Sequence, residues 1–84
     1  GKDLALNRIF YVGYYSGRDL SNIIVLDFST DKLVKIIAAS NGLWNNGEWT
    51  LMNGRTYVLS GESDVTRVLR FDKLVIPGLG TVQK

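Results

Sequence analysis

Two Asn-Gly pairs, Asn46-Gly47 and Asn53-Gly54, lie close together in a stretch that otherwise has the composition of β-strands. Asn and Gly both tolerate the positive φ angles of a two-residue type I′ turn, so each pair predicts a tight β-hairpin. Two successive hairpins predict short antiparallel strands on either side of each turn. A helix is not expected anywhere in this part of the chain.

The two predicted turns determine which residues would face each other. Across the first turn, Trp44 would lie opposite Trp49. Across the second, Trp49 would lie opposite Val58 and Leu51 opposite Thr56. One side of the sheet would then carry a hydrophobic wall of Trp44, Trp49, Leu51 and Val58. The other side would carry Glu48, Thr50, Met52, Arg55, Tyr57 and Leu59.

The rest of the chain also predicts strands. Four segments are rich in β-branched and aromatic residues and are bounded by polar turns: 8–15, 22–28, 33–39 and 65–75. A four-residue turn between the second and third segments would place Phe28 opposite Leu33 and Ile24 opposite Ile37. A one-residue slip in this register would exchange the two faces of the strand.

Length and hydrophobic patterning indicate the fold class. The 84 residues allow one small domain, and 45% of them are hydrophobic, which is typical of a globular protein. Segments 22–28 and 33–39 are apolar on both faces, whereas an antiparallel sheet with one face in water alternates cleanly. We therefore predict an all-β, antiparallel, folded-over or jelly-roll-like sheet over residues 1–84, with a loose tail at 77–84.

The composition argues against catalysis. The chain has no Cys and no His, so the commonest general base and the commonest metal ligands are missing. Asp27, Glu62 and Asp64 are not brought together by any spacing in the sequence, and no glycine-rich phosphate loop opens a helix. We predict no enzyme activity, no metal site and no cofactor. No run approaches the ~20 apolar residues that cross a bilayer.

Two further functions remain open from the residues themselves. Arg8, Phe10, Tyr11, Tyr14 and Arg18 alternate rings with guanidinium groups, as in an OB-like module that binds single-stranded nucleic acid. A net charge of +2 and scattered basic residues favour instead a strand with alternate residues in the core, and we expect no nucleic-acid partner. The other function is that of a purely structural β-domain for assembly.

A motif in the hairpin region resembles a known family. The pattern Trp49-x-Leu51-x-Asn53-Gly54-x-x-Tyr57, with Ala39 and Trp44 before it, is similar to the periplasmic β-domain of the LptF/LptG family, the permease subunits of the lipopolysaccharide exporter. The charged strand at 66–74 and Pro77 fit the segment that follows in that family. The resemblance covers about residues 31–78.

The resemblance implies a function. The chain would be an OstA-like β-jellyroll piece of a longer membrane protein, on the periplasmic side of the inner membrane. There it would conduct lipopolysaccharide or another acylated lipid, without catalysis, toward the outer membrane. The groove candidates are Trp44, Trp49, Leu51 and Val58. The ATPase subunit would be reached only through the full-length permease.

The resemblance also implies partners at the strand edges. Family members join sibling β-jellyroll domains edge to edge, and their periplasmic domain is longer than 84 residues. The first strands would then be missing, and an exposed apolar edge would invite self-association. The candidate edge-pairing residues are Arg8, Phe10, Val12, Tyr14, Arg67, Leu69 and Phe71.

Overall fold

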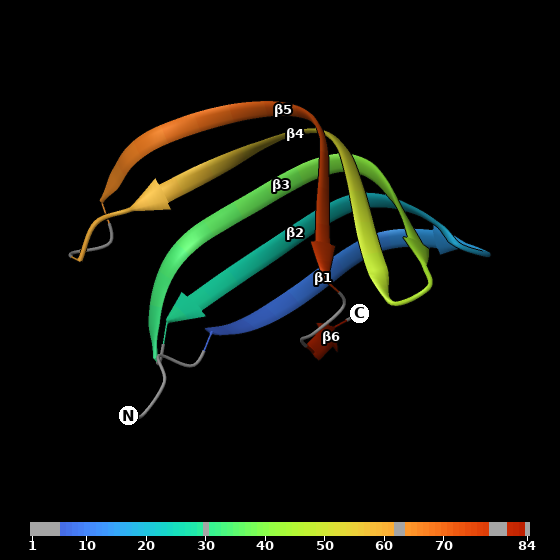
Figure 1. The fold of residues 1–84 in the computed structure, drawn as a ribbon, viewed down its shortest axis with the longest axis horizontal. Coiled ribbons are helices and arrows are strands. Elements are labelled where there is room, and N and C mark those ends of the chain that lie inside the picture. Colours follow the sequence, from blue (N-terminus) through green and yellow to red (C-terminus); the bar gives the residue numbers. More distant parts are fainter. Residues whose placement is uncertain (1–5, 30, 62–63, 78–80, 84) are drawn as a thin grey trace.

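The computed structural model describes residues 6–29, 31–61, 64–77 and 81–83 of the chain. The described part is all-β, as predicted. Its strands are β1 (Leu6–Ser16), β2 (Asp19–Ser29), β3 (Lys32–Asn45), β4 (Glu48–Leu59), β5 (Val65–Pro77) and β6 (Thr81–Gln83). They form one open six-stranded sheet in the order β5-β4-β3-β2-β1-β6 (Figure 1). Neighbouring strands are antiparallel, except that β6 runs parallel to β1.

The first Asn-Gly pair forms the predicted hairpin turn. Asn46 and Gly47 have φ angles of 53° and 76°, which are the left-handed values that a type I′ turn needs. Trp44 pairs with Trp49 across this turn, and the same register continues down β3 and β4 as far as Lys35 and Val58. This part of the prediction is confirmed.

The second predicted hairpin is wrong. Asn53 has a positive φ of 58°, but β4 continues through Asn53-Gly54 to Leu59. Trp49 therefore pairs with Ile76 of β5 on its second side, and not with Val58. The reason is that β3 and β5 offer hydrogen-bonding partners on both sides of a continuous β4. The positive φ angle kinks the strand but does not reverse it.

The kink at Asn53 belongs to a line that crosses the sheet. Regular pairing is interrupted at the same level in every strand from β1 to β5. Asn22 has a φ of 55° there, and Ser40 Oγ donates a hydrogen bond of 3.2 Å to the carbonyl oxygen of Asn53. We call this level the bend line; it consists of Gly13, Asn22, Ser40, Asn53 and Asp72.

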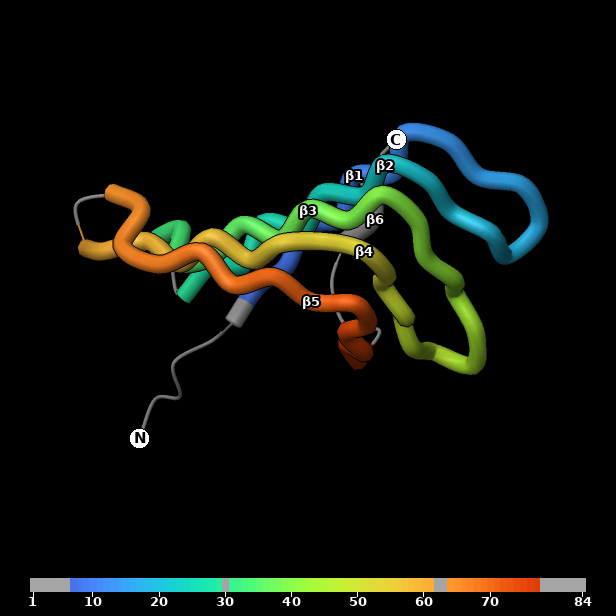
Figure 2. The backbone as a smooth tube through the Cα atoms, turned by 90° about the horizontal axis from the view of Figure 1, so that it is seen from above, coloured from blue at the N-terminus to red at the C-terminus, as the bar shows by residue number. Residues whose placement is uncertain are grey.

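The bend line folds the sheet over on itself. Positive φ angles break the two-residue alternation of a strand, so Leu20 and Ile23 are both buried although they are three positions apart. In β4, Leu51 and Gly54 are likewise three positions apart on one face, with Leu51 buried and Gly54 half-buried. Figures 1 and 2 show the strands arching at this level and the β3–β4 hairpin turning away from the rest of the sheet. We call the side with the buried residues the inner face and the opposite side the outer face.

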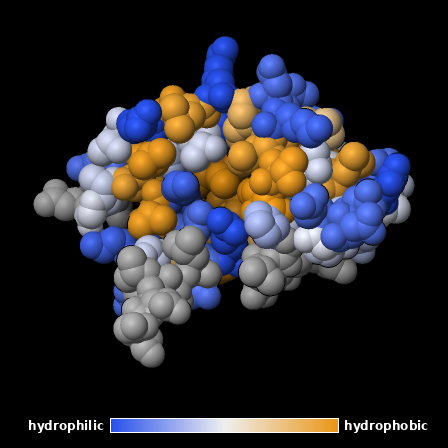
Figure 3. Space-filling model, in the orientation of Figure 1, coloured by the Kyte–Doolittle hydropathy of each residue, from blue (hydrophilic) through white to orange (hydrophobic). Residues whose placement is uncertain are grey.

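The hydrophobic core lies in the fold of the sheet. Phe10 of β1 and Trp49 of β4 are not on neighbouring strands, yet their rings stack with centroids 4.2 Å apart. The core consists of Phe10, Leu20, Ile23, Val25, Ile37, Ala39, Trp49, Leu51 and Ile76. In the view of Figure 3, apolar residues gather in the middle of the molecule and hydrophilic residues surround them.

One further prediction needs correction. Phe28 pairs with Leu33 as predicted, but a β-bulge at Asp27/Phe28 shifts the register by one residue, so that Ile24 pairs with Ala38 and not with Ile37. The bulge restores the alternation that places the apolar residues of both strands in the core. Within the tail, β6 pairs with β1 over Ile9–Tyr11; that residues 77–84 are loose as a whole stays a prediction. Residues 78–80 and 84 lie outside the described part.

Candidate functional site

The inner face is a concave apolar surface that is covered on one side and accessible on the other. One row of paired residues crosses it from β1 to β5: Phe10, Val25, Ile37, Thr56 and Leu69. Phe10, Val25 and Ile37 are buried, Thr56 is half-buried, and Leu69 is 44% exposed. Along this row the surface is therefore packed over β1 to β3 and open at Thr56 of β4 and Leu69 of β5.

Tryptophan packing closes the covered side. Trp49 is 5% exposed and lies between the ring of Phe10 and the ring of Trp44, whose centroid is 4.8 Å away. Ile76 pairs with Trp49 from the C-terminal half of β5 and is buried too. Because these side chains contact one another, this side of the fold is a core and leaves no open groove.

The four predicted groove residues divide into two groups. Trp49 and Leu51 are core residues, so they do not line an accessible surface. Trp44 is 40% exposed and Val58 is half-buried, so both can be reached. They lie at opposite ends of the inner face, since Val58 pairs with Lys35 and Arg67. Lipid contact at all four residues stays a prediction.

Charged residues border the inner face near Val58. The carboxylate of Asp27 is almost fully buried, and its Oδ2 lies 3.5 Å from Nε of Arg8 on β1. Its Oδ1 has no hydrogen-bond partner. Lys35 of β3 and Arg67 of β5 lie in the same cross-strand row as Asp27, and both are exposed. The margin of the open side therefore carries more positive than negative charge. The sequence predicted no partner for Asp27.

The two edges of the sheet differ. β5 pairs with β4 and with no other described strand, so Arg67, Leu69 and Phe71 lie on an edge strand. β1 is covered by β6 around Phe10, whereas Val12 and Tyr14 extend beyond β6. Pairing with another chain at these edges stays a prediction.

The residues of the nucleic-acid hypothesis do not gather into one surface. Phe10 is fully buried and stacked on Trp49, so its ring is not available to a base. Arg8 pairs with Asp27. Tyr11, Tyr14 and Arg18 are exposed, but a stacking platform with a phosphate track needs the whole set, and Phe10 and Arg8 are already engaged.

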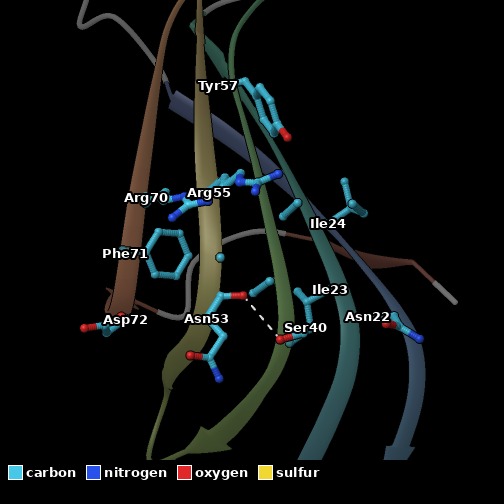
Figure 4. A pocket seen from close by; sticks show the side chains of 13 residues that line it. Asn22, Ile23, Ile24, Ser40, Asn53, Arg55, Tyr57, Arg70, Phe71 and Asp72 are labelled. Carbon is cyan, nitrogen blue, oxygen red and sulfur yellow. Dashed lines mark hydrogen bonds between the residues drawn. The ribbon is translucent and has the colours of Figure 1, made fainter.

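A pocket of about 540 Å³ lies across β2 to β5 at the bend line, and the sequence analysis did not predict it. Figure 4 shows Arg55 and Tyr57 from β4, Arg70 from β5 and Ile24 from β2 around it. Arg55 and Arg70 are directly paired across β4 and β5. Antiparallel pairing of a continuous β4 with β5 would have predicted that Arg55 and Arg70 are neighbours. The sequence analysis missed this because it predicted a second hairpin within β4.

The described residues contain neither a cluster of metal ligands nor a membrane-spanning helix. No group of three or more acidic, Cys or His residues is placed to hold a metal ion there. In the same described residues there is no helix that is long and apolar enough to span a membrane.

Comparison with known proteins identifies the family. Neither a curated protein nor a solved structure matches the chain significantly. The family model described as lipopolysaccharide export system permease LptF/LptG matches residues 2–83, almost the whole chain. The family resemblance is thereby confirmed, and it extends well beyond the motif around the second Asn-Gly pair. This chain therefore belongs to the LptF/LptG family, the inner-membrane permeases of the lipopolysaccharide export system.

Proposed function

We propose that this chain is a non-catalytic periplasmic module through which the acyl chains of lipopolysaccharide pass along the open side of the inner face. The observation that carries the proposal is the concave apolar face, which is packed over β1 to β3 and accessible at Thr56, Val58 and Leu69. An acyl chain needs a continuous apolar surface with little water, and such a face supplies it.

The charges at the margin support the same proposal. Lys35 and Arg67 are exposed beside Val58, where the polar part of an acylated lipid would leave the apolar surface. Lipopolysaccharide carries anionic groups next to its acyl chains, and guanidinium and ammonium groups bind such anions. Nothing catalytic is required of this module, because the ATPase subunit acts through the full-length permease.

Photo-crosslinking tests the conduit. A photoreactive amino acid replaces Leu69 on the inner face, and in the matched control it replaces Val75 on the outer face of the same strand. The two residues are 44% and 47% exposed, so collision alone would label them equally. We expect lipopolysaccharide to crosslink at position 69 and not at position 75. Equal crosslinking at both positions, or none at 69, contradicts the proposal.

We further propose that the edge of β5 joins a sibling β-domain and extends the groove from one module to the next. The support is that β5 pairs with no described strand other than β4 along Val65–Pro77 and that its N-terminal half is exposed. Unpaired backbone groups at such an edge pair readily with another strand.

Sedimentation velocity tests the edge in this chain. We expect association that increases with concentration and that Leu69→Lys abolishes, because a charge on an edge strand blocks strand pairing. Ile24→Lys, on the internal strand β2, is the control and should leave association unchanged. If Ile24→Lys abolishes association and Leu69→Lys does not, copies meet through the outer face and the edge proposal fails.

A further inference from the structure

The pocket at the bend line, which we call the outer pocket because Arg55 and Tyr57 lie on the outer face, contains two positive charges without a carboxylate partner. Arg55 and Arg70 are cross-strand partners and both are exposed. Like charges directly opposite each other destabilise a sheet. Asp72 is the acidic residue of this pocket, and in Figure 4 its carboxylate extends away from the two guanidinium groups. Among the described residues the ion pair found is that of Arg8 with Asp27. Arg55 and Arg70 are therefore available to bind an anion from solution.

The outer face next to this pair is apolar. One row of paired residues crosses it beside the arginines: Ile9, Leu26, Ile36, Tyr57 and Val68. Each strand from β1 to β5 contributes one member, and all five are half-buried or exposed. We call this the outer apolar row. Tyr57 belongs to both the row and the pocket, so the anion site and the apolar surface are continuous.

We propose that this surface binds the phosphate of an anionic phospholipid headgroup, with Arg55 and Arg70 sharing the phosphate oxygens and the outer apolar row contacting the lipid beside it. Guanidinium groups match phosphate oxygens bidentately. A free phosphate or a phosphorylated sugar would use the two arginines alone and would gain nothing from Val68 or Ile36. A lipid uses both parts, which is why we assign the site to a membrane surface.

This site is separate from the proposed lipopolysaccharide groove. The groove lies on the inner face, whereas Arg55 and Arg70 lie on the outer face with Tyr57. The outer site would hold the domain against a bilayer while the inner face carries the cargo. Either proposal can fail without the other, because the crosslinking positions 69 and 75 are not part of the outer site.

Vesicle co-sedimentation of the full chain tests the inference. The probe is phosphatidylcholine vesicles that contain phosphatidylglycerol, and vesicles of phosphatidylcholine alone are the reference. We expect Arg55→Gln/Arg70→Gln to weaken partitioning to the anionic vesicles about 30-fold, as the loss of two surface cations predicts. Arg18→Gln/Lys32→Gln is the matched control, because it removes the same charge from two exposed residues, one in the β1–β2 turn and one at the start of β3. It should weaken partitioning about threefold or less.

Two more variants distinguish the possible sources of the phosphate. Val68→Ser should weaken vesicle binding severalfold and leave the affinity for inorganic phosphate unchanged. Arg55→Lys/Arg70→Lys keeps the charge and should restore part of the binding, which shows that the fold is intact. Equal losses in the glutamine double variant and its control would overturn the site. Binding that inorganic phosphate or glycerol phosphate displaces fully, with Val68→Ser unaffected, would overturn the lipid assignment.

Discussion

Trp49→Ala is expected to lower the free energy of unfolding by about 3–5 kcal/mol, which is the usual cost of truncating a buried aromatic residue to Ala. Trp49 is 5% exposed and its ring stacks on Phe10, so the substitution leaves a cavity and removes an aromatic pair. The stack joins β1 to β4 across the fold of the sheet. Its loss therefore weakens the contact that keeps the sheet folded over.

Denaturant unfolding followed by circular dichroism measures this effect. Trp44→Ala is the matched control, because the same ring type is removed from the neighbouring position of the same hairpin, where it is 40% exposed. We expect the control to cost about 1–2 kcal/mol, in proportion to its smaller buried area. Small domains are stable by only ~5–15 kcal/mol, so the Trp49 variant should be largely unfolded at moderate denaturant concentrations. Equal costs for the two variants would contradict the packing described here.

Gly54→Ala is expected to cost about 3 kcal/mol, at the upper end of what overpacking usually costs. A Cβ on Gly54 would contact the carbonyl oxygen of Ala38 and would lie 2.5 Å from Cζ of Phe71. The Phe71 ring has some freedom to move, but the backbone oxygen of β3 is held in the β3–β4 ladder. The added methyl therefore has to push β3 and β4 apart at the bend line.

The matched control is Gly47→Ala in the Asn46-Gly47 turn. Gly47 has a φ of 76° and no atom within 4 Å of a built Cβ. Its substitution costs only the strain of a left-handed Ala, about 1 kcal/mol. Thermal unfolding of both variants decides between a packing role and a turn role for Gly54. If Gly54→Ala is as mild as Gly47→Ala, Asn53-Gly54 is not held between β3 and Phe71.

Local sequence signals predicted most of the elements of this fold. The strands around residues 8–15, 22–28, 33–39 and 65–75 all form, and the turn at Asn46-Gly47 has the expected backbone angles. These features depend on short-range preferences: β-branched and aromatic residues favour strands, and Asn-Gly favours positive φ angles. The apolar pattern on both faces also correctly predicted a folded-over sheet, because folding over is how a single sheet buries one of its apolar faces in a small domain.

The grouping of β4 residues by face held although the predicted topology did not. Trp49, Leu51, Thr56 and Val58 share the inner face, and Arg55 and Tyr57 share the outer face. A two-residue turn and a kink at Asn53 both break the alternation at the same place. The local pattern is therefore identical for a strand that reverses and for one that bends.

The choice between reversal and bending was made by the tertiary structure. β4 continues through Asn53-Gly54 because β3 and β5 pair along its whole length, and these pairings join residues far apart in the sequence. The same long-range register brought Phe10 onto Trp49 and Arg55 beside Arg70. The sequence by itself determined the strands, the turn at Asn46-Gly47 and the face on which each β4 residue lies, since these depend on residues that are neighbours in the sequence. Which side chains became core and which form an anion site depended on strands that meet only after the sheet has folded over.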